Sequence, residues 1–190
     1  MHPDSMEGPR LVPPDQRLNV FALVLYVPSP LGIFLDNLRR ELAPACNPHA
    51  HVSLLPPRSV AVSWEEASAQ ARALTESWPV FDVELAGIEI FPVTDVIYIE
   101  LGAGAAELRR MHAAMSAGAL EAPEPFAYHP HITLAQELPQ EQVAAAEGLA
   151  RRQWREYKGE RRFQAATATF VQNTQGNCWI DLADYSLKKT

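Results

Sequence analysis

A pattern of histidine, β-branched apolar residue, hydroxyl residue and leucine occurs twice, as His51-Val52-Ser53-Leu54 and as His131-Ile132-Thr133-Leu134. A β-strand turns alternate side chains to opposite faces, so the histidine and the hydroxyl residue of each pattern share one face. Two such strands side by side would present two imidazoles and two hydroxyls. That set can carry out general acid–base chemistry at a phosphate without a metal ion.

Opening of a 2′,3′-cyclic phosphate shows what these groups could do. One neutral imidazole takes a proton from the attacking water, and one imidazolium gives a proton to the leaving ribose oxygen. The reference pKa of histidine, about 6.5, allows both forms near neutral pH. The hydroxyls of Ser53 and Thr133 can donate to the non-bridging oxygens, where negative charge builds up.

Both patterns, in the surroundings His51-Val52-Ser53-Leu54-Leu55-Pro56-Pro57-Arg58 and His129-Pro130-His131-Ile132-Thr133-Leu134-Ala135, resemble the paired His-x-Thr/Ser-x signatures of the 2H phosphoesterase superfamily. The likeness is to its bacterial 2′-5′ RNA ligase and cyclic phosphodiesterase members. The resemblance implies that His51 and His131 are catalytic and that Ser53 and Thr133 bind phosphate. Serine stands in the first motif where threonine is commoner, which keeps the hydroxyl. Which histidine is base and which is acid stays open at this point.

The elements that must position the motifs follow from apolar periodicity and from breaker residues. Strands are predicted at Leu18–Val27, His49–Leu55, Val80–Phe91 with a bend at Gly87, Asp95–Leu101, Tyr128–Ala135, Phe163–Gln172 and Cys178–Tyr185. Helices are predicted at Leu31–Leu42, from a Ser63 N-cap to about Ser77, after Gly104 to about Ala117, and at Gln140–Arg152. Strands and helices mix without strict alternation, which predicts an α+β fold. The resemblance implies two lobes related by a pseudo-twofold axis, with antiparallel-rich sheets flanking a central cleft.

Length and composition set limits on these interpretations. The 190 residues, 47% hydrophobic, suffice for one compact unit, and we expect a proline-rich, flexible tail over residues 1–17 and a single two-lobed domain over 18–190. A net charge of −7 argues against a broad nucleic-acid-binding face. No apolar run approaches the roughly 18 residues of a membrane span, and no signal peptide is evident, so a cytoplasmic protein is expected. A self-contained two-lobed unit favours a monomer.

Other residues are weaker candidates. Arg58 could bind a phosphate through its guanidinium, with a surface charge as the alternative interpretation. Tyr128, Tyr98 and Phe91 are candidates for stacking a base, although core packing is the competing interpretation. His112 is expected at the surface or half-buried.

His49 and His129 each precede a motif histidine by two residues, which creates His-x-His twice, a spacing also used for metal ligands. No carboxylate or cysteine accompanies these pairs in sequence, so local hydrogen bonding is the favoured interpretation and no metal or other cofactor is expected. A metal hydrolase remains one alternative.

The sequence therefore predicts a metal-independent phosphodiesterase that opens 2′,3′-cyclic phosphates on RNA ends or small cyclic nucleotides. It could also have 2′-5′ RNA ligase activity, in which a 5′-hydroxyl replaces water. Such ligation would not use ATP, because no phosphate-binding Gly-x-x-x-x-Gly-Lys loop is present. The other alternative is a non-catalytic module that binds RNA ends or nucleotides at the same residues.

Overall fold

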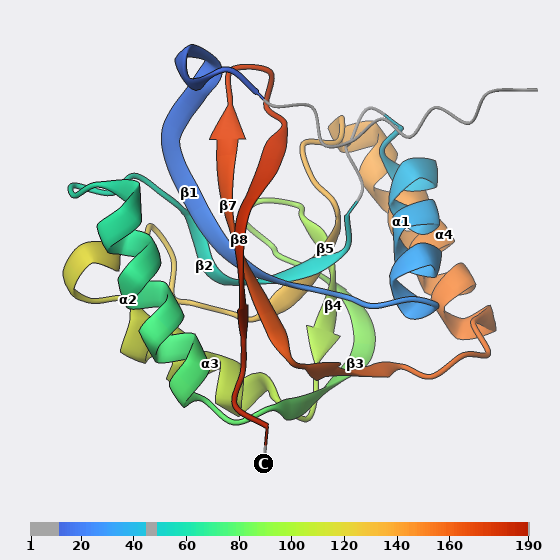
Figure 1. The fold of residues 1–190 in the computed structure, drawn as a ribbon. Helices are drawn as coiled ribbons and strands as arrows, with labels where there is room; N and C mark the ends of the chain where they lie inside the picture. Colours follow the sequence, from blue (N-terminus) through green and yellow to red (C-terminus); the bar gives the residue numbers. More distant parts are fainter. Residues whose placement is uncertain (1–11, 45–48, 190) are drawn as a thin grey trace, which may run out of the picture.

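The structure is a computed structural model that describes residues 12–44 and 49–189. The described residues form eight strands and four helices, whose arrangement is seen in Figure 1. The strands are β1 (Arg17–Tyr26), β2 (His51–Arg58), β3 (Phe81–Ile90), β4 (Ile97–Leu101), β5 (His131–Ala135), β6 (Arg162–Ala165), β7 (Thr167–Thr174) and β8 (Trp179–Ser186). The helices are α1 (Leu31–Leu42), α2 (Trp64–Ser77), α3 (Ala105–Met115) and α4 (Gln140–Glu156), with 3₁₀ turns at Pro14–Gln16 and Gly118–Leu120.

The strands form two antiparallel four-stranded sheets, in the orders β2-β1-β7-β8 and β5-β4-β3-β6. Each motif strand is therefore the edge strand of its sheet, and β2 and β5 contact each other. The chain passes from the second sheet back to the first between β6 and β7, at Ala166. The predicted α+β class with antiparallel sheets is confirmed.

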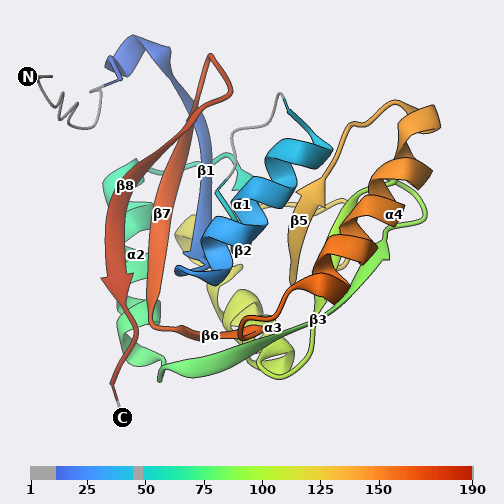
Figure 2. The ribbon, with the colours of Figure 1, turned by 90° about the vertical axis from the view of Figure 1, so that its right-hand side faces the viewer.

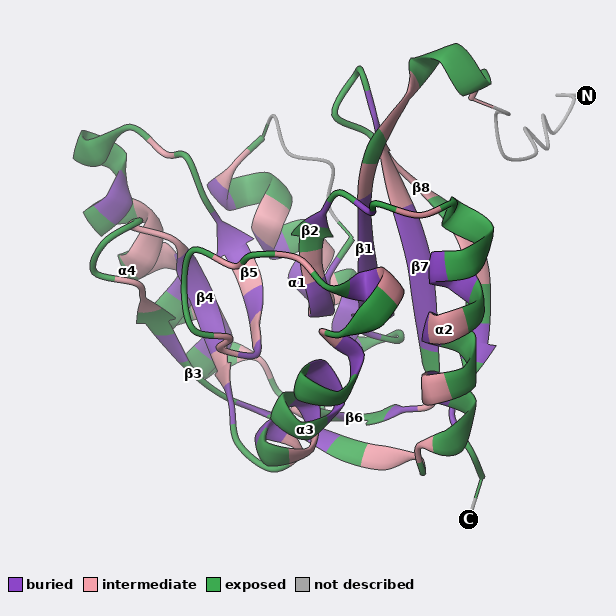
Figure 3. Cartoon of the chain, turned by 90° about the vertical axis from the view of Figure 1, so that its left-hand side faces the viewer, coloured by how far each residue is buried: buried purple, intermediate pink, exposed green. Residues whose placement is uncertain are grey.

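The four helices pack against the two sheets. α2 packs against β7 and β8, α3 against β2, and α4 against β3, whereas α1 reaches across to β5 and α4 (Figure 2). Buried positions gather on the strands and on the inward sides of these helices, as Figure 3 shows. One core cluster runs through both sheets, because α1, which joins two strands of the first sheet, also contacts the second.

Several predicted local signals are confirmed. α1 has the predicted bounds, and the Ser63 hydroxyl accepts a hydrogen bond from the Glu66 amide at 3.2 Å, which caps α2. The pairing of β3 with β4 shifts register between Leu85 and Ile88, around the predicted bend at Gly87. Gly104 is the N-cap of α3 and has a φ of 88°, and a Cβ there would lie 2.4 Å from the Asp82 carbonyl oxygen.

Several predicted boundaries were wrong, among them the start of the first motif strand, which is His51 and not His49, and the end of α4, which is Glu156 and not Arg152. β2 continues through Pro56 and Pro57 to Arg58, because an edge strand tolerates residues that cannot donate to a ladder. The predicted strand Phe163–Gln172 is two strands, β6 and β7, which lie in different sheets. The second motif strand begins at His131, not at Tyr128.

At the N-terminus, residues 1–11 of the expected tail lie outside the described residues. Pro14–Gln16 form a 3₁₀ turn and Arg17 begins β1. Within the described ranges, no helix is long and apolar enough to cross a membrane.

Candidate active site

The two motifs show the same alternation of exposed and buried side chains. In β2 and β5 the histidine and the hydroxyl residue are half-exposed, while the intervening apolar residue and the leucine are buried. Directly opposed residues of an antiparallel pair share a face. His51 opposes Tyr26 and His131 opposes Glu100, so these residues lie on the side of their sheets that faces away from the core. We call the side of each sheet that carries His51 or His131 the motif face of that sheet.

Both motif imidazoles are held in the same way. The Nδ1 atom of His51 lies 2.7 Å from the His49 carbonyl oxygen, and Nδ1 of His131 lies 2.7 Å from that of His129. A carbonyl only accepts, so each Nδ1 carries the hydrogen and Nε2 holds the lone pair in the neutral ring. Among the described residues, no hydrogen bond engages either Nε2. Each ring can therefore exchange a proton through Nε2.

The environments of the two rings differ in charge. Burial lowers the pKa of His51 to about 4, and the charges of Arg39 and His131 also oppose its protonation. Burial lowers the pKa of His131 too, but there the negative charge of Glu100 favours the protonated ring. Both rings are thus neutral at pH 7 in the free protein. The two rings stand on β2 and β5, which contact each other.

His49 and His129 lie just before the strands and have different partners. The His49 ring stacks on Tyr26 with centroids 3.6 Å apart, and the Tyr26 hydroxyl donates to Asp181. Nε2 of His129 lies 2.7 Å from Oε2 of Glu100. Within the described part of the chain, no group of three or more histidine, cysteine, aspartate or glutamate side chains is arranged to hold a metal ion.

Phe91 and Tyr98 lie beside the second motif histidine. Their rings stack with centroids 4.0 Å apart, and both meet the His131 ring edge-on, at 5.0 and 5.3 Å. Tyr98 is only 6% exposed, while Phe91 is half-buried. Two of the three base-stacking candidates are thus at the site, and Phe91 is the more accessible.

The third candidate, Tyr128, supports the first motif strand. Its hydroxyl donates to the Ser53 carbonyl oxygen at 2.8 Å, and its ring stacks on His112 with centroids 3.7 Å apart. His112 was expected at the surface or half-buried, but it is only 8% exposed, because Nδ1 donates to the Leu54 carbonyl oxygen at 2.8 Å. Burial raises the pKa of Tyr128, so its hydroxyl stays a donor over the working pH range.

Arg58, the phosphate-binding candidate, has partners within the protein. It is 6% exposed, donates to the carbonyl oxygens of Pro56 and Leu120, and forms an ion pair with Glu124. Glu124 also lies 3.3 Å from Nε2 of His112. These contacts favour a structural role for Arg58, in the polar network behind β2.

We expect Arg58→Met to lower the free energy of unfolding by about 3 kcal/mol, because the largely buried Glu124 carboxylate loses its arginine partner and two carbonyl oxygens lose their donor. Urea unfolding at pH 7.5 measures this change. Arg40→Met, on the exposed side of α1, is the matched control and should change the stability by less than about 0.5 kcal/mol. A loss below about 1 kcal/mol for Arg58→Met would contradict the structural role.

Sequence reasoning missed Arg39. From α1, its Nη1 donates to the Thr133 carbonyl oxygen at 3.0 Å, and its charge opposes protonation of His51. The guanidinium therefore lies where the two motif strands meet. Tyr128 makes the matching contact in the other direction. Arg39 donates to the carbonyl oxygen of Thr133 in the second sheet, and Tyr128, just before β5, donates to that of Ser53 in the first sheet. One signal was present: Arg39 follows the buried Leu35 by one helical turn.

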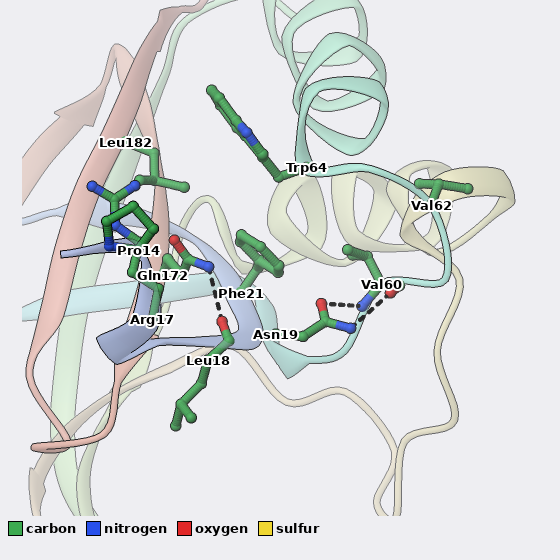
Figure 4. Close-up of a pocket in the computed structure, with 10 residues that line it drawn as sticks. All are labelled: Pro14, Arg17, Leu18, Asn19, Phe21, Val60, Val62, Trp64, Gln172 and Leu182. Carbon is green, nitrogen blue, oxygen red and sulfur yellow. Dashed lines mark hydrogen bonds between the residues drawn. The ribbon is translucent and has the colours of Figure 1, made fainter. Parts of the chain in front are cut away.

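A pocket of about 510 Å³ lies elsewhere, at the start of α2 (Figure 4). Trp64, Val60, Phe21 and Leu182 line it, together with Arg17 and other polar residues. Phe21 and Val60 belong to the core cluster, so this pocket opens on the side of the sheet opposite the motif face. No motif residue lines it.

Comparisons with known proteins agree with this geometry. A model of the 2′-5′ RNA ligase superfamily matches residues 27–177. No curated protein matches the sequence. Among solved structures, Escherichia coli LigT complexed with NADP+ is similar with a TM-score of 0.62 and 16% identity, covering 91% of this chain and 98% of LigT.

Two further structures share the fold at low identity. TT0787 of Thermus thermophilus has a TM-score of 0.58 and 16% identity, over 90% of this chain and 98% of that one. Kluyveromyces marxianus Usb1, with uridine monophosphate, has a TM-score of 0.50 and 14% identity, over 86% and 97%. The family match spans both motifs and most of the chain. The chain belongs to the 2′-5′ RNA ligase superfamily of 2H phosphoesterases.

Proposed function

We propose that this protein is a metal-independent 2′,3′-cyclic phosphodiesterase that produces 2′-phosphates. The observation that carries the proposal is that the two motif histidines are held by matching hydrogen bonds. Each ring donates from Nδ1 to a carbonyl at 2.7 Å, and each has a hydroxyl residue two positions further along the same face. In-line opening of a cyclic phosphate requires two proton-transfer groups, and two hydroxyls that donate hydrogen bonds to the phosphate assist it.

In this mechanism His51 is the base and His131 the acid in hydrolysis. His51, with the pKa of about 4 and the nearby Arg39, stays neutral and takes a proton from water as its oxygen attacks phosphorus. The bond from phosphorus to the ribose 3′-oxygen breaks, and Nε2–H of protonated His131 gives that oxygen its proton. Glu100 favours the protonated form of His131. The hydroxyls of Ser53 and Thr133 donate to the non-bridging oxygens.

The same arrangement could also carry out 2′-5′ ligation without ATP. A 5′-hydroxyl would replace water as the attacking group and give its proton to His51 while its oxygen forms the new bond to phosphorus. The bond from phosphorus to the ribose 3′-oxygen would break, and that oxygen would take its proton from His131, which leaves a 2′-5′ linkage. The solved LigT structures include complexes with phosphate, ATP and 3′-AMP. Ligands of this kind support a nucleotide substrate for this protein as well.

Hydrolysis of the four 2′,3′-cyclic mononucleotides with excess chelator tests the proposal. We expect turnover by the purified protein, with the 2′-phosphate as product, which separates from the 3′-isomer by chromatography. Loss of turnover on chelation would instead favour a metal hydrolase. Binding of these nucleotides without any product would favour a non-catalytic binding module.

The pH dependence gives a second test. In the free protein both histidine pKa values lie below 6.5, and kcat/KM needs one ring neutral and the other protonated. Above both values the acid lacks its proton, and below both the base is protonated. We therefore expect the kcat/KM maximum on the acid side of pH 6.5, with activity falling towards pH 8. A maximum above pH 7.5 would contradict the lowered pKa values.

A further inference from the structure

The motif face of the first sheet carries carboxylates next to the catalytic residues. One row of opposed residues runs from Ser53 through Val24 and Thr169 to Asp184. Asp184 is exposed and accepts a hydrogen bond from the Thr169 hydroxyl. Asp181 is also exposed and accepts from Tyr26, the residue opposite His51. Two negative charges therefore stand on this face, beyond His51 and Ser53.

The second sheet has the same character. Glu100 opposes His131, and Glu89 opposes Tyr98, which in turn opposes Thr133. Further from the motif, Glu84 opposes Arg162 on β6. Glu89 is 53% exposed and lies 3.7 Å from Arg151, a residue of α4 that is closer to Glu147. The carboxylates thus begin next to the catalytic histidine and continue across β3.

On the described strands, positive charge is sparse near the motif residues. The described strands contain three arginines and no lysine. Arg17 lines the pocket on the α2 side, and Arg58 is buried against Glu124. Arg162 shares the face of Glu84, which it opposes, but it stands on β6, the strand furthest from β5. Arg39, where the motif strands meet, is a cation whose charge acts on His51. Positive charge at the catalytic centre suits one phosphate there, with acidic surfaces on both sides.

We infer that the substrate carries a single phosphate, as in a mononucleoside 2′,3′-cyclic phosphate, and that an RNA strand with the same end is a poor substrate. This inference rests on the proposed function. Proteins that bind RNA strands neutralise successive phosphates with lysine and arginine. Each further phosphate of a strand crossing the motif face would instead meet Asp181, Asp184 or Glu89, and like charges repel.

The test compares three substrates with the same terminal nucleotide: the cyclic mononucleotide, a dinucleotide and a tetranucleotide, each ending in a 2′,3′-cyclic phosphate. At about 20 mM salt we expect kcat/KM for the tetranucleotide to be about tenfold below that for the mononucleotide, which corresponds to about 1.4 kcal/mol. Because salt screens repulsion, the gap should narrow at about 0.5 M salt. A tetranucleotide that reacts as fast as the mononucleotide, or that reacts more slowly as salt is added, would overturn the inference.

Neutralising the carboxylates should remove the discrimination. We expect Glu89→Gln, Asp181→Asn and Asp184→Asn together to raise kcat/KM for the tetranucleotide about fivefold and to leave the mononucleotide unchanged. Each amide keeps an oxygen that can accept the existing hydrogen bonds. Glu65→Gln, Glu76→Gln and Glu156→Gln make the same change in net charge on α2 and α4, and should leave the discrimination intact. Equal effects of the two triple variants would refute a local origin.

Different results would contradict the cyclic phosphodiesterase activity and the preference for a singly phosphorylated substrate. If all three substrates are hydrolysed with equal kcat/KM, only the choice of a singly phosphorylated substrate fails. If none is hydrolysed, the proposed cyclic phosphodiesterase activity is refuted. Calorimetry of the binding of the corresponding 2′-phosphates then decides whether the protein prefers the mononucleotide or the tetranucleotide. Tighter binding of the mononucleotide would support it, and tighter binding of the tetranucleotide would overturn it.

Discussion

His51→Ala and His131→Ala are each expected to lower kcat for a 2′,3′-cyclic mononucleotide about 10³-fold, with little change in the melting temperature. Each substitution removes one positioned proton-transfer group, and such groups typically contribute about 10²–10⁴-fold. Because both rings act in one step, the double variant should fall little below the single ones. Rates measured with chelator, together with thermal unfolding followed by circular dichroism, check both parts of the prediction.

His49→Ala is the matched control for these variants. It removes an imidazole two residues from His51 but keeps the His49 carbonyl that holds Nδ1. The His49 ring contacts Tyr26, so only a small loss is expected, less than about tenfold. If His49→Ala were as damaging as His51→Ala, the proton transfer would not belong to the motif histidine alone. Activity in His51→Ala close to that of the unaltered protein would refute the mechanism.

The sequence predicts the motif positions well because their signal is local. Alternation over four residues assigns His51 and Ser53 to one face and Val52 and Leu54 to the core, and the structure agrees. The roles of Arg39 and Tyr128 could not be predicted in this way. Their partners are backbone carbonyls 94 and 75 residues away, and a carbonyl belongs to every residue type.

The assignment of strands to sheets also lies beyond local pattern. Arg162–Ala165 and Thr167–Thr174 form an almost continuous β-prone stretch, and only pairing with β3 and with β1 separates them. Arg58 shows the same difficulty at the level of a side chain. Its position after the first motif suggested phosphate binding, but Glu124, which lies 66 residues further along the chain, pairs with it.

Thr133→Val and Ser53→Ala are expected to lower kcat about 100-fold each, while KM changes little. The hydroxyls are proposed to donate to non-bridging oxygens that gain charge only as the transition state forms, and loss of one such donor typically costs about 10²–10³-fold in kcat. Valine keeps the shape of threonine, and Thr133 is half-exposed, so the fold should tolerate the change. Steady-state kinetics with a cyclic mononucleotide separates kcat from KM.

Thr169→Val tests whether the position of the hydroxyl decides this effect. Thr169 lies on the motif face, in the same row of opposed residues as Ser53, but its hydroxyl donates to Asp184. The same substitution there should leave kcat within about threefold, because no reacting oxygen is in its reach under the proposed mechanism. A fall mainly in affinity for Thr133→Val, seen as a raised KM with kcat unchanged, would instead mean that Thr133 binds substrate and transition state equally. The hydroxyl would then position the phosphate, and stabilisation of the developing charge would have to come from Arg39, which lies beside the same pair of strands.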